Sequence, residues 1–125
     1  MKNNKILLVD DNEQFLSLLN KFLVSNGFEV VCSNNGVEAK ELFLKFKPNL
    51  VITDIVMPDI DGIELLLAIR ELNPDILVIA MSGGNQGHAD TYLQMADTLG
   101  ADIIISKPFQ LADLLIDVKK LLVTK

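Results

Sequence analysis

Short apolar runs alternate with helical stripes along the whole chain. Five runs have the length of a β-strand, and four of them are rich in Ile, Leu or Val without clean alternation of apolar and polar residues. Such runs are typical of strands that are buried on both faces of a parallel sheet. We therefore predict strands over residues 5–10, 28–33, 50–54, 76–81 and 102–106.

Between the predicted strands, apolar residues recur at the spacing of one helix face. The clearest stripe follows the i, i+3, i+4, i+7, i+8 pattern of an amphipathic helix. It consists of Phe15, Leu18, Leu19, Phe22 and Leu23. Similar stripes predict helices around residues 39–46 and 111–122, and we place two further helices over about 62–72 and 88–99. The first four helices are followed by residues that commonly end a helix, namely Gly27, Pro48, Asn73 with Pro74, and Gly100.

Strict alternation of five strands with five helices predicts an α/β fold. Because β–α–β crossovers are right-handed, the expected architecture is a doubly wound, five-stranded parallel sheet with helices on both faces. The 125 residues suffice for one such domain and not for two, so we assign residues 1–125 to a single domain. In such sheets the ligand site lies beyond the carboxyl ends of the strands, where the strand order reverses.

Composition narrows the classes of function. Half of the residues are apolar and 22% are charged, which excludes intrinsic disorder. The 17 acidic and 11 basic residues give a net charge of -6, the wrong sign for a protein that grips nucleic-acid phosphates directly. The apolar stretch 6–9 is too short for a signal peptide or a membrane span. With one cysteine, Cys32, and one histidine, His88, we expect no internal disulfide and no zinc cluster, and a reducing cytoplasm fits.

Polar residues stand where four of the predicted strands end. Asp10 and Asp11 follow the first strand, Asp54 ends the third, Ser82 follows the fourth, and the fifth runs into Lys107. Because the carboxyl ends of parallel strands meet at one edge of a sheet, we expect these side chains to converge there. The first pair also has a local explanation, since Asp10, Asp11 or Asn12 would serve as the N-cap of the first helix. The pair can fill both roles.

Asp54 is harder to explain by local structure. It follows the nearly continuous apolar segment 50–53, where a carboxylate is partly desolvated unless it is paired or bound to a metal. The alternative to a paired or metal-bound Asp54 is that this residue caps the turn before Pro58. Three close carboxylates repel one another unless a cation lies among them. Oxygen ligands without His or Cys suit a hard ion such as Mg2+, which commonly keeps waters and a substrate phosphate. We therefore expect a divalent-metal site that accepts phosphate.

Lys107 and Ser82 each allow two interpretations. Lys107 is either an exposed lysine before Pro108 or an ion-pair partner that offers positive charge to a phosphoryl group. Ser82, which precedes Gly83 and Gly84, either forms part of a turn or donates its hydroxyl to a phosphate oxygen. The predicted acidic edge adds weight to the second interpretation of each residue.

Taken in order, these motifs resemble the receiver domain of bacterial response regulators, the CheY-like family, in its stand-alone, single-domain form. The resemblance rests on Asp10-Asp11, on Asp54 with Met57-Pro58 and Gly62, on Ser82-Gly83, and on Gly100-Ala101-Asp102 leading to Lys107-Pro108-Phe109. It covers the whole chain. It implies the flavodoxin-like strand order 2-1-3-4-5.

The resemblance also implies a role for each residue of the acidic edge. Asp54 is implied to be the phosphoacceptor, which takes its phosphoryl group from a phosphohistidine. Asp11, Asp54 and the backbone carbonyl of Val56 are implied to ligate Mg2+, and Asp10 is implied to assist through bound water. Ser82 and Lys107 would then bind the phosphoryl oxygens.

Two further features follow from the same resemblance. The peptide bond between Lys107 and Pro108 is implied to be cis. An aromatic residue usually stands three positions before the lysine and moves inward on activation, whereas this chain has Ile104 there. The usual account of signal output therefore does not transfer directly to this chain.

The function implied is that of a single-domain response regulator in a two-component or phosphorelay system. It would be cytoplasmic, and it would catalyse only its own phosphorylation and dephosphorylation. The expected partners are a sensor histidine kinase or a histidine phosphotransfer protein, and a downstream effector protein, because no output domain follows the last predicted helix. We expect a monomer or a weak dimer that forms on phosphorylation, and no direct nucleic-acid or membrane partner.

Two other functions stay open. A Mg2+-dependent phosphohydrolase with an aspartyl-phosphate intermediate would use the same residues, but short loops and no cap domain leave little to enclose a small substrate. The other is a receiver-like scaffold that binds partners without phosphorylation. The intact set of acidic-edge residues argues against that scaffold.

Overall fold

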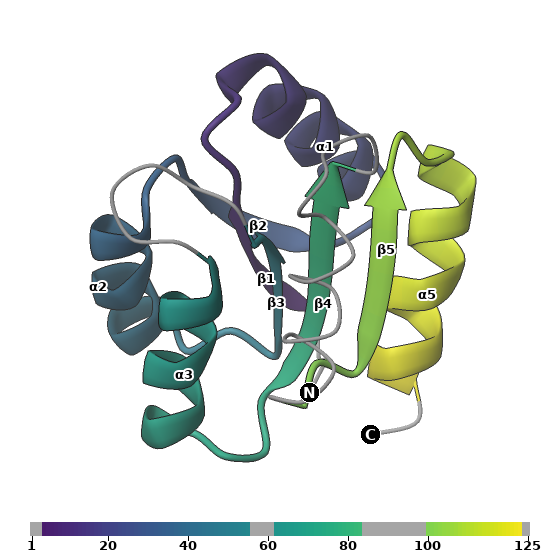
Figure 1. Ribbon diagram of the computed structural model, residues 1–125. Coiled ribbons are helices and arrows are strands. Elements are labelled where there is room, and N and C mark those ends of the chain that lie inside the picture. Colours follow the sequence, from purple (N-terminus) through teal and green to yellow (C-terminus); the bar gives the residue numbers. More distant parts are fainter. Residues whose placement is uncertain (1–3, 56–61, 84–99, 124–125) are drawn as a thin grey trace.

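A single parallel sheet organises the molecule in the computed structural model, which describes residues 4–55, 62–83 and 100–123 (Figure 1). Its strands are β1 (Lys5–Val9), β2 (Glu29–Ser33), β3 (Leu50–Asp54), β4 (Leu77–Gly83) and β5 (Ile103–Lys107). They lie in the order β2-β1-β3-β4-β5, and each neighbouring pair is parallel. The predicted fold class and strand order are confirmed.

The described helices cover both faces of this sheet. They are α1 (Glu13–Ser25), α2 (Gly36–Phe46), α3 (Gly62–Leu72) and α5 (Leu111–Val123). Helices α1 and α5 pack on one face, and α2 and α3 pack on the other (Figure 1). All four were predicted from the sequence, three of them from the apolar spacing, and the helix predicted over residues 88–99 lies outside the described residues.

Alternate residues of the central strands enter two separate cores. On one face, Ile6 and Leu8 join side chains of α1 and α5. On the other face, Leu7 and Val9 join side chains of α2 and α3. All four β1 side chains are fully buried. The strand reads as a continuous apolar run because helices cover both of its faces.

Strand β4 extends two residues beyond its predicted end at Met81. It continues through Ser82 and Gly83, which pair with Ser106 and Lys107 of β5. The prediction ended too early because Ser82 and Gly83 are not apolar, whereas the pairing that extends the strand is made by the backbone. The extension places Ser82 within the strand.

The first helix begins at a side-chain cap. Asn12 has extended backbone angles, and its Oδ1 accepts a hydrogen bond from the backbone N–H of Phe15 at 3.1 Å. Of the three residues predicted to serve as this cap, Asn12 therefore does so. Asp10 instead accepts a hydrogen bond from the backbone N–H of Asn12 at 2.9 Å. Asn12 thus caps the helix, Asp10 binds the backbone of Asn12, and Asp11 is exposed to solvent.

We expect Asn12→Ala to lower the free energy of unfolding by about 1 kcal/mol, because it leaves an N–H group of the first turn of α1 without its cap. Urea unfolding measures this loss. Gln14→Ala is the matched control, because Gln14 is exposed in the same turn, and its effect should stay within about 0.5 kcal/mol. Equal stability of the two variants would contradict the capping role.

Candidate functional site

The acidic edge lies at the point where the strand order reverses. The chain goes from β1 to β2 on one side and then to β3 on the other, so β1 and β3 are neighbours at the switch. Asp10 directly follows β1, and Asp54 is the last residue of β3. In doubly wound sheets the crevice at this position is the usual ligand site.

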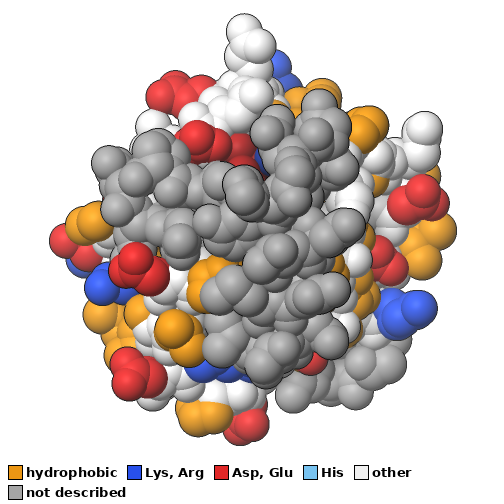
Figure 2. All heavy atoms as spheres, in the orientation of Figure 1, with side chains coloured by type: hydrophobic (Ala, Val, Ile, Leu, Met, Phe, Trp, Pro, Cys, Tyr) orange, Lys and Arg blue, Asp and Glu red, His pale blue; other side chains and the backbone are white. Residues whose placement is uncertain are grey.

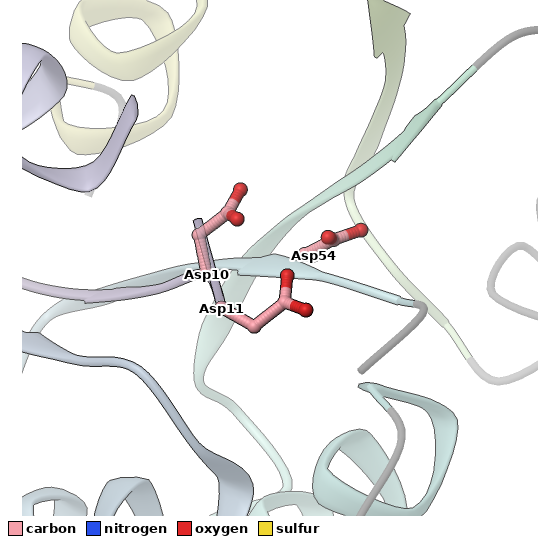
Figure 3. Close-up of side chains that lie close together, drawn as sticks. All are labelled: Asp10, Asp11 and Asp54. Atoms are coloured by element: carbon pink, nitrogen blue, oxygen red, sulfur yellow. The ribbon is translucent and has the colours of Figure 1, made fainter. Parts of the chain in front are cut away.

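Three carboxylates converge at this switch point. Asp10, Asp11 and Asp54 each offer one oxygen, and these oxygens all lie within 4.8 Å of one another. Figure 3 shows the three side chains leaving adjacent strand ends and carrying their carboxylates into one region. Acidic side chains are also visible at this end of the molecule in Figure 2. For these three carboxylates, the predicted convergence is confirmed.

The three carboxylates differ in their exposure to solvent. Asp10 is fully buried and Asp54 is 7% exposed, whereas Asp11 is exposed. Charged groups are buried in proteins only when they are paired or bound to a metal. An exposed carboxylate beside two buried ones leaves one side of the cluster open to an ion from solvent.

Lys107 supplies positive charge to the same cluster. Its Nζ lies 2.6 Å from Oδ2 of Asp10 and 3.5 Å from Oδ2 of Asp54. Lys107 comes from the end of β5, and its peptide bond to Pro108 is cis. Of its two predicted roles, the ion pair is therefore the one that the structure shows.

The charges of this cluster do not balance. Three carboxylates carry three negative charges, and the single ammonium of Lys107 carries one positive charge, so a formal excess of two negative charges remains. The donors are all carboxylate oxygens, which suit a hard divalent ion rather than a soft one. The described residues therefore form a group that could hold such an ion.

Gly62 allows the start of α3 to lie directly on the backbone of Asp54. Its N–H donates to the carbonyl oxygen of Ile55 at 3.1 Å. A Cβ atom at this position would clash with the carbonyl oxygen of Asp54 and with Cα of Ile55. The first residue of α3 and the last residue of β3 are thus in direct backbone contact.

We expect Gly62→Ala to lower the free energy of unfolding by about 1–3 kcal/mol, because the added methyl group forces the backbone at Asp54 to shift. Metal affinity should fall as well, since the shift moves a carboxylate. Urea unfolding and a Mg2+ titration measure the two effects. Gly27→Ala is the control: Gly27 has a φ of 95° but no neighbour within 4 Å, so that change strains the backbone far from the carboxylates. Unchanged metal affinity in Gly62→Ala would contradict the close approach.

Two predicted site residues are not tested by the described geometry. The structure describes Ser82 only as part of β4, opposite Ser106. Its side chain and the whole of Val56 lie outside the described part of the chain. That the Ser82 hydroxyl donates to a phosphoryl oxygen, and that the Val56 carbonyl ligates the metal, stay predictions.

Ile104 and Cys32 occupy ordinary packing positions. Ile104 pairs with Ala80 across β4 and β5 and packs against a small cluster that contains Ile55 and Ile63. Cys32 is half-buried on β2, and burial raises the pKa of its thiol. The thiol is therefore protonated at neutral pH, which makes it a poor nucleophile.

One aromatic contact was not predicted at all. Phe15 is a member of the apolar stripe of α1, but its ring centroid also lies 4.6 Å from Nζ of Lys107. Phe109 packs against Phe15 edge to face, with 5.8 Å between the ring centroids. Phe15 and Lys107 are 92 positions apart along the chain, so no local sequence pattern connects them.

The doubly wound sheet and its switch point define an α/β protein in which three carboxylates form a group that could hold a hard cation, with the ammonium of Lys107 beside them. A family model of the response regulator receiver domain matches residues 6–119, and the chain belongs to this family. It is a receiver domain of the kind found in two-component signal transduction. Among the described residues, no helix is both long enough and apolar enough to span a membrane.

Individual relatives agree with this assignment. Sporulation initiation phosphotransferase F of Bacillus subtilis is 35% identical over 125 residues, which is 100% of this chain and 98% of that protein. Response regulator MprA of Mycobacterium leprae is 32% identical over 94% of this chain, which spans only 50% of that relative. A CheY-like receiver domain protein from Methanospirillum hungatei has a similar structure, with a TM-score of 0.87, 30% identity, and coverage of 97% of this chain and 94% of that one.

Proposed function

We propose that Asp54 accepts a phosphoryl group from a phosphohistidine of a sensor histidine kinase or a histidine phosphotransfer protein. One observation carries this proposal: the nearly buried Asp54 carboxylate lies within 3.5 Å of the Lys107 ammonium and within 4.8 Å of oxygens of Asp10 and Asp11. A nucleophile, a cation that can bind an anion, and a donor set for a metal thus meet at one point. Phosphoryl transfer depends on positioning and on charge neutralisation, and this arrangement provides both.

The metal ion of this site is proposed to be Mg2+. Asp11, Asp54 and the carbonyl of Val56 would ligate it, and the buried Asp10 would assist through bound water. The formal excess of two negative charges matches a divalent cation. When bound, Mg2+ supplies positive charge to the phosphoryl oxygens.

In the proposed transfer, one oxygen of the Asp54 carboxylate attacks phosphorus. A P–O bond forms as the P–N bond to the donor imidazole breaks, and the imidazole nitrogen keeps the electron pair of that bond. Lys107, whose Nζ lies 3.5 Å from Oδ2 of Asp54, is proposed to bind one phosphoryl oxygen. The hydroxyl of Ser82 is proposed to donate to a second oxygen. Water later hydrolyses the acyl phosphate, which restores the carboxylate and releases inorganic phosphate.

The chain is proposed to catalyse only its own phosphorylation and dephosphorylation. Two cavities of about 290 and 460 Å³ share the lining residues Pro48, Asn49 and Asn73. These residues precede β3 and β4, so the cavities lie at the amino ends of the strands, whereas Asp54 lies at a carboxyl end. Neither cavity supports a small-molecule substrate for Asp54.

We further propose that residues 1–125 form one cytoplasmic receiver domain, and that the phosphoryl group either changes the binding of a downstream effector protein or passes to another protein. The name of the Bacillus subtilis relative, a phosphotransferase, supports the second route. In either case the protein would be a monomer or a weak dimer that forms on phosphorylation.

The proposal is tested by incubating the protein with acetyl phosphate and Mg2+ and measuring its intact mass. We expect one phosphoryl group per chain, and fragmentation of the peptides should place it on Asp54. The same incubation with a chelator is the control and should give little label. A label on another residue, or none with Mg2+ present, would overturn the proposed function.

A further inference from the structure

The ammonium group of Lys107 lies over the face of the Phe15 ring. Nζ lies 4.6 Å from the ring centroid, which is inside the range of about 6 Å for an attractive cation–π contact. The same atom lies 2.6 Å from Asp10 Oδ2 and 3.5 Å from Asp54 Oδ2. The ammonium therefore contacts two carboxylates and one aromatic face.

Two separate contacts position Phe15, one through its backbone and one through its ring. The backbone N–H of Phe15 donates to Oδ1 of Asn12 at 3.1 Å, which places the residue in the first turn of α1. The ring of Phe109 meets the ring of Phe15 at an interplanar angle of 75°, an edge-to-face contact. Phe109 is only two residues beyond Lys107. The same short segment therefore carries both the ammonium and the ring that packs against Phe15.

We propose that Phe15 is a positioning residue for phosphoryl transfer: its ring face holds the Lys107 ammonium where the phosphoryl group on Asp54 will lie. The inference rests on the proposed function. Lysine ends in a compact charge on a flexible four-carbon stem, and such a side chain pairs with a carboxylate in several rotamers. The ring restricts these rotamers.

An aromatic ring suits this position better than a charged group. A further carboxylate would hold Lys107 more strongly, but it would also compete for the metal and repel the phosphoryl anion. The ring is neutral overall, and its negative face attracts only the cation. It can therefore orient Lys107 without opposing the incoming phosphoryl group.

The test compares rates of labelling by acetyl phosphate with Mg2+ in three variants. Phe15→Leu keeps an apolar side chain but removes the ring face, and we expect labelling to slow by about threefold to tenfold. Pentafluorophenylalanine at position 15 keeps the ring shape but reverses its charge distribution, and it should slow labelling similarly. Phe46→Leu is the matched control. It removes a ring that lies 5.4 Å from Nζ of Lys5, at the start of β1, and it should leave the rate unchanged.

The outcomes distinguish the inference about Phe15 from the proposed function of Asp54. If the fluorinated protein labels at the wild-type rate, the ring acts by packing alone and the positioning role is overturned. The fluorinated protein also keeps the test valid if Phe15→Leu disturbs the fold. A labelled wild type with unaffected Phe15 variants overturns this inference and leaves the proposed function standing. An unlabelled wild type overturns the proposed function, and the role of Phe15 falls with it.

Discussion

Asp54→Asn is expected to take up no phosphoryl group from acetyl phosphate under conditions in which the wild type is labelled. Asparagine has nearly the same shape as aspartate, but its amide is not a nucleophile toward phosphorus. Asp10 also pairs with Lys107, at 2.6 Å, but it is fully buried, and the exposed Asp11 is proposed to be a metal ligand, so neither is expected to replace Asp54 as the phosphoacceptor. Intact mass after incubation with Mg2+ measures the loss.

The same substitution should weaken Mg2+ binding, because one of the three carboxylates becomes neutral. Mg2+ raises the wild-type melting temperature by mass action, since the ion binds the folded state, and this rise should shrink in Asp54→Asn. Asp75→Asn is the matched control, because Asp75 is exposed beyond α3, at the amino ends of the strands. A labelled Asp54→Asn protein would show that the phosphoacceptor has been misassigned.

Lys107→Met is expected to lower the free energy of unfolding by about 2–4 kcal/mol in metal-free buffer, because it leaves the buried Asp10 carboxylate without its cation. Asp10 is fully buried, and its Oδ2 lies 2.6 Å from the missing ammonium. Among the described residues, the hydrogen bond that remains on Asp10 comes from the N–H of Asn12, and a neutral donor does not neutralise the charge. Urea unfolding in the presence of a chelator measures the loss.

Mg2+ should restore part of the stability that Lys107→Met loses. The ion and the ammonium neutralise the same carboxylates, so removing the ammonium should raise the affinity for Mg2+ while it slows labelling. Lys119→Met is the control, because Lys119 is exposed on α5, and it should change the stability by less than about 0.5 kcal/mol. If Lys107→Met were as stable as Lys119→Met, the ion pair would contribute little.

Most of the secondary structure could be predicted from the spacing of apolar residues. The apolar run of β3 matches its observed bounds, Leu50–Asp54, and the stripe of α1 lies inside Glu13–Ser25. Other strand bounds differ from the prediction by one residue, and the largest difference is at the end of β4, where the strand continues through Ser82 and Gly83. Their backbone pairs with β5, and the identity of a side chain does not report such pairing.

The candidate site was predictable only in part, because contacts between residues far apart in the chain leave no pattern in the sequence. Asp10 and Asp54 could be placed together because both follow apolar runs, and the ends of parallel strands share one edge. The residues next to Lys107 left two interpretations open, because an exposed lysine and an ion-paired lysine have the same neighbours along the chain, and only the predicted acidic edge favoured the ion pair. The contacts of Gly62 with Asp54 and of Phe15 with Lys107 also left no local signal.

The sequence by itself determined the fold class, the strand ends that carry charge, and the chemistry of the donors, because periodicity and residue type are local properties. The tertiary structure decided which charges meet. It buried Asp10 completely, brought Lys107 from β5 to β1, and set the ring of Phe15 beside the ammonium. Coulomb and cation–π energies depend on the distance between groups in space. Those distances exist only once strands far apart in the chain lie side by side.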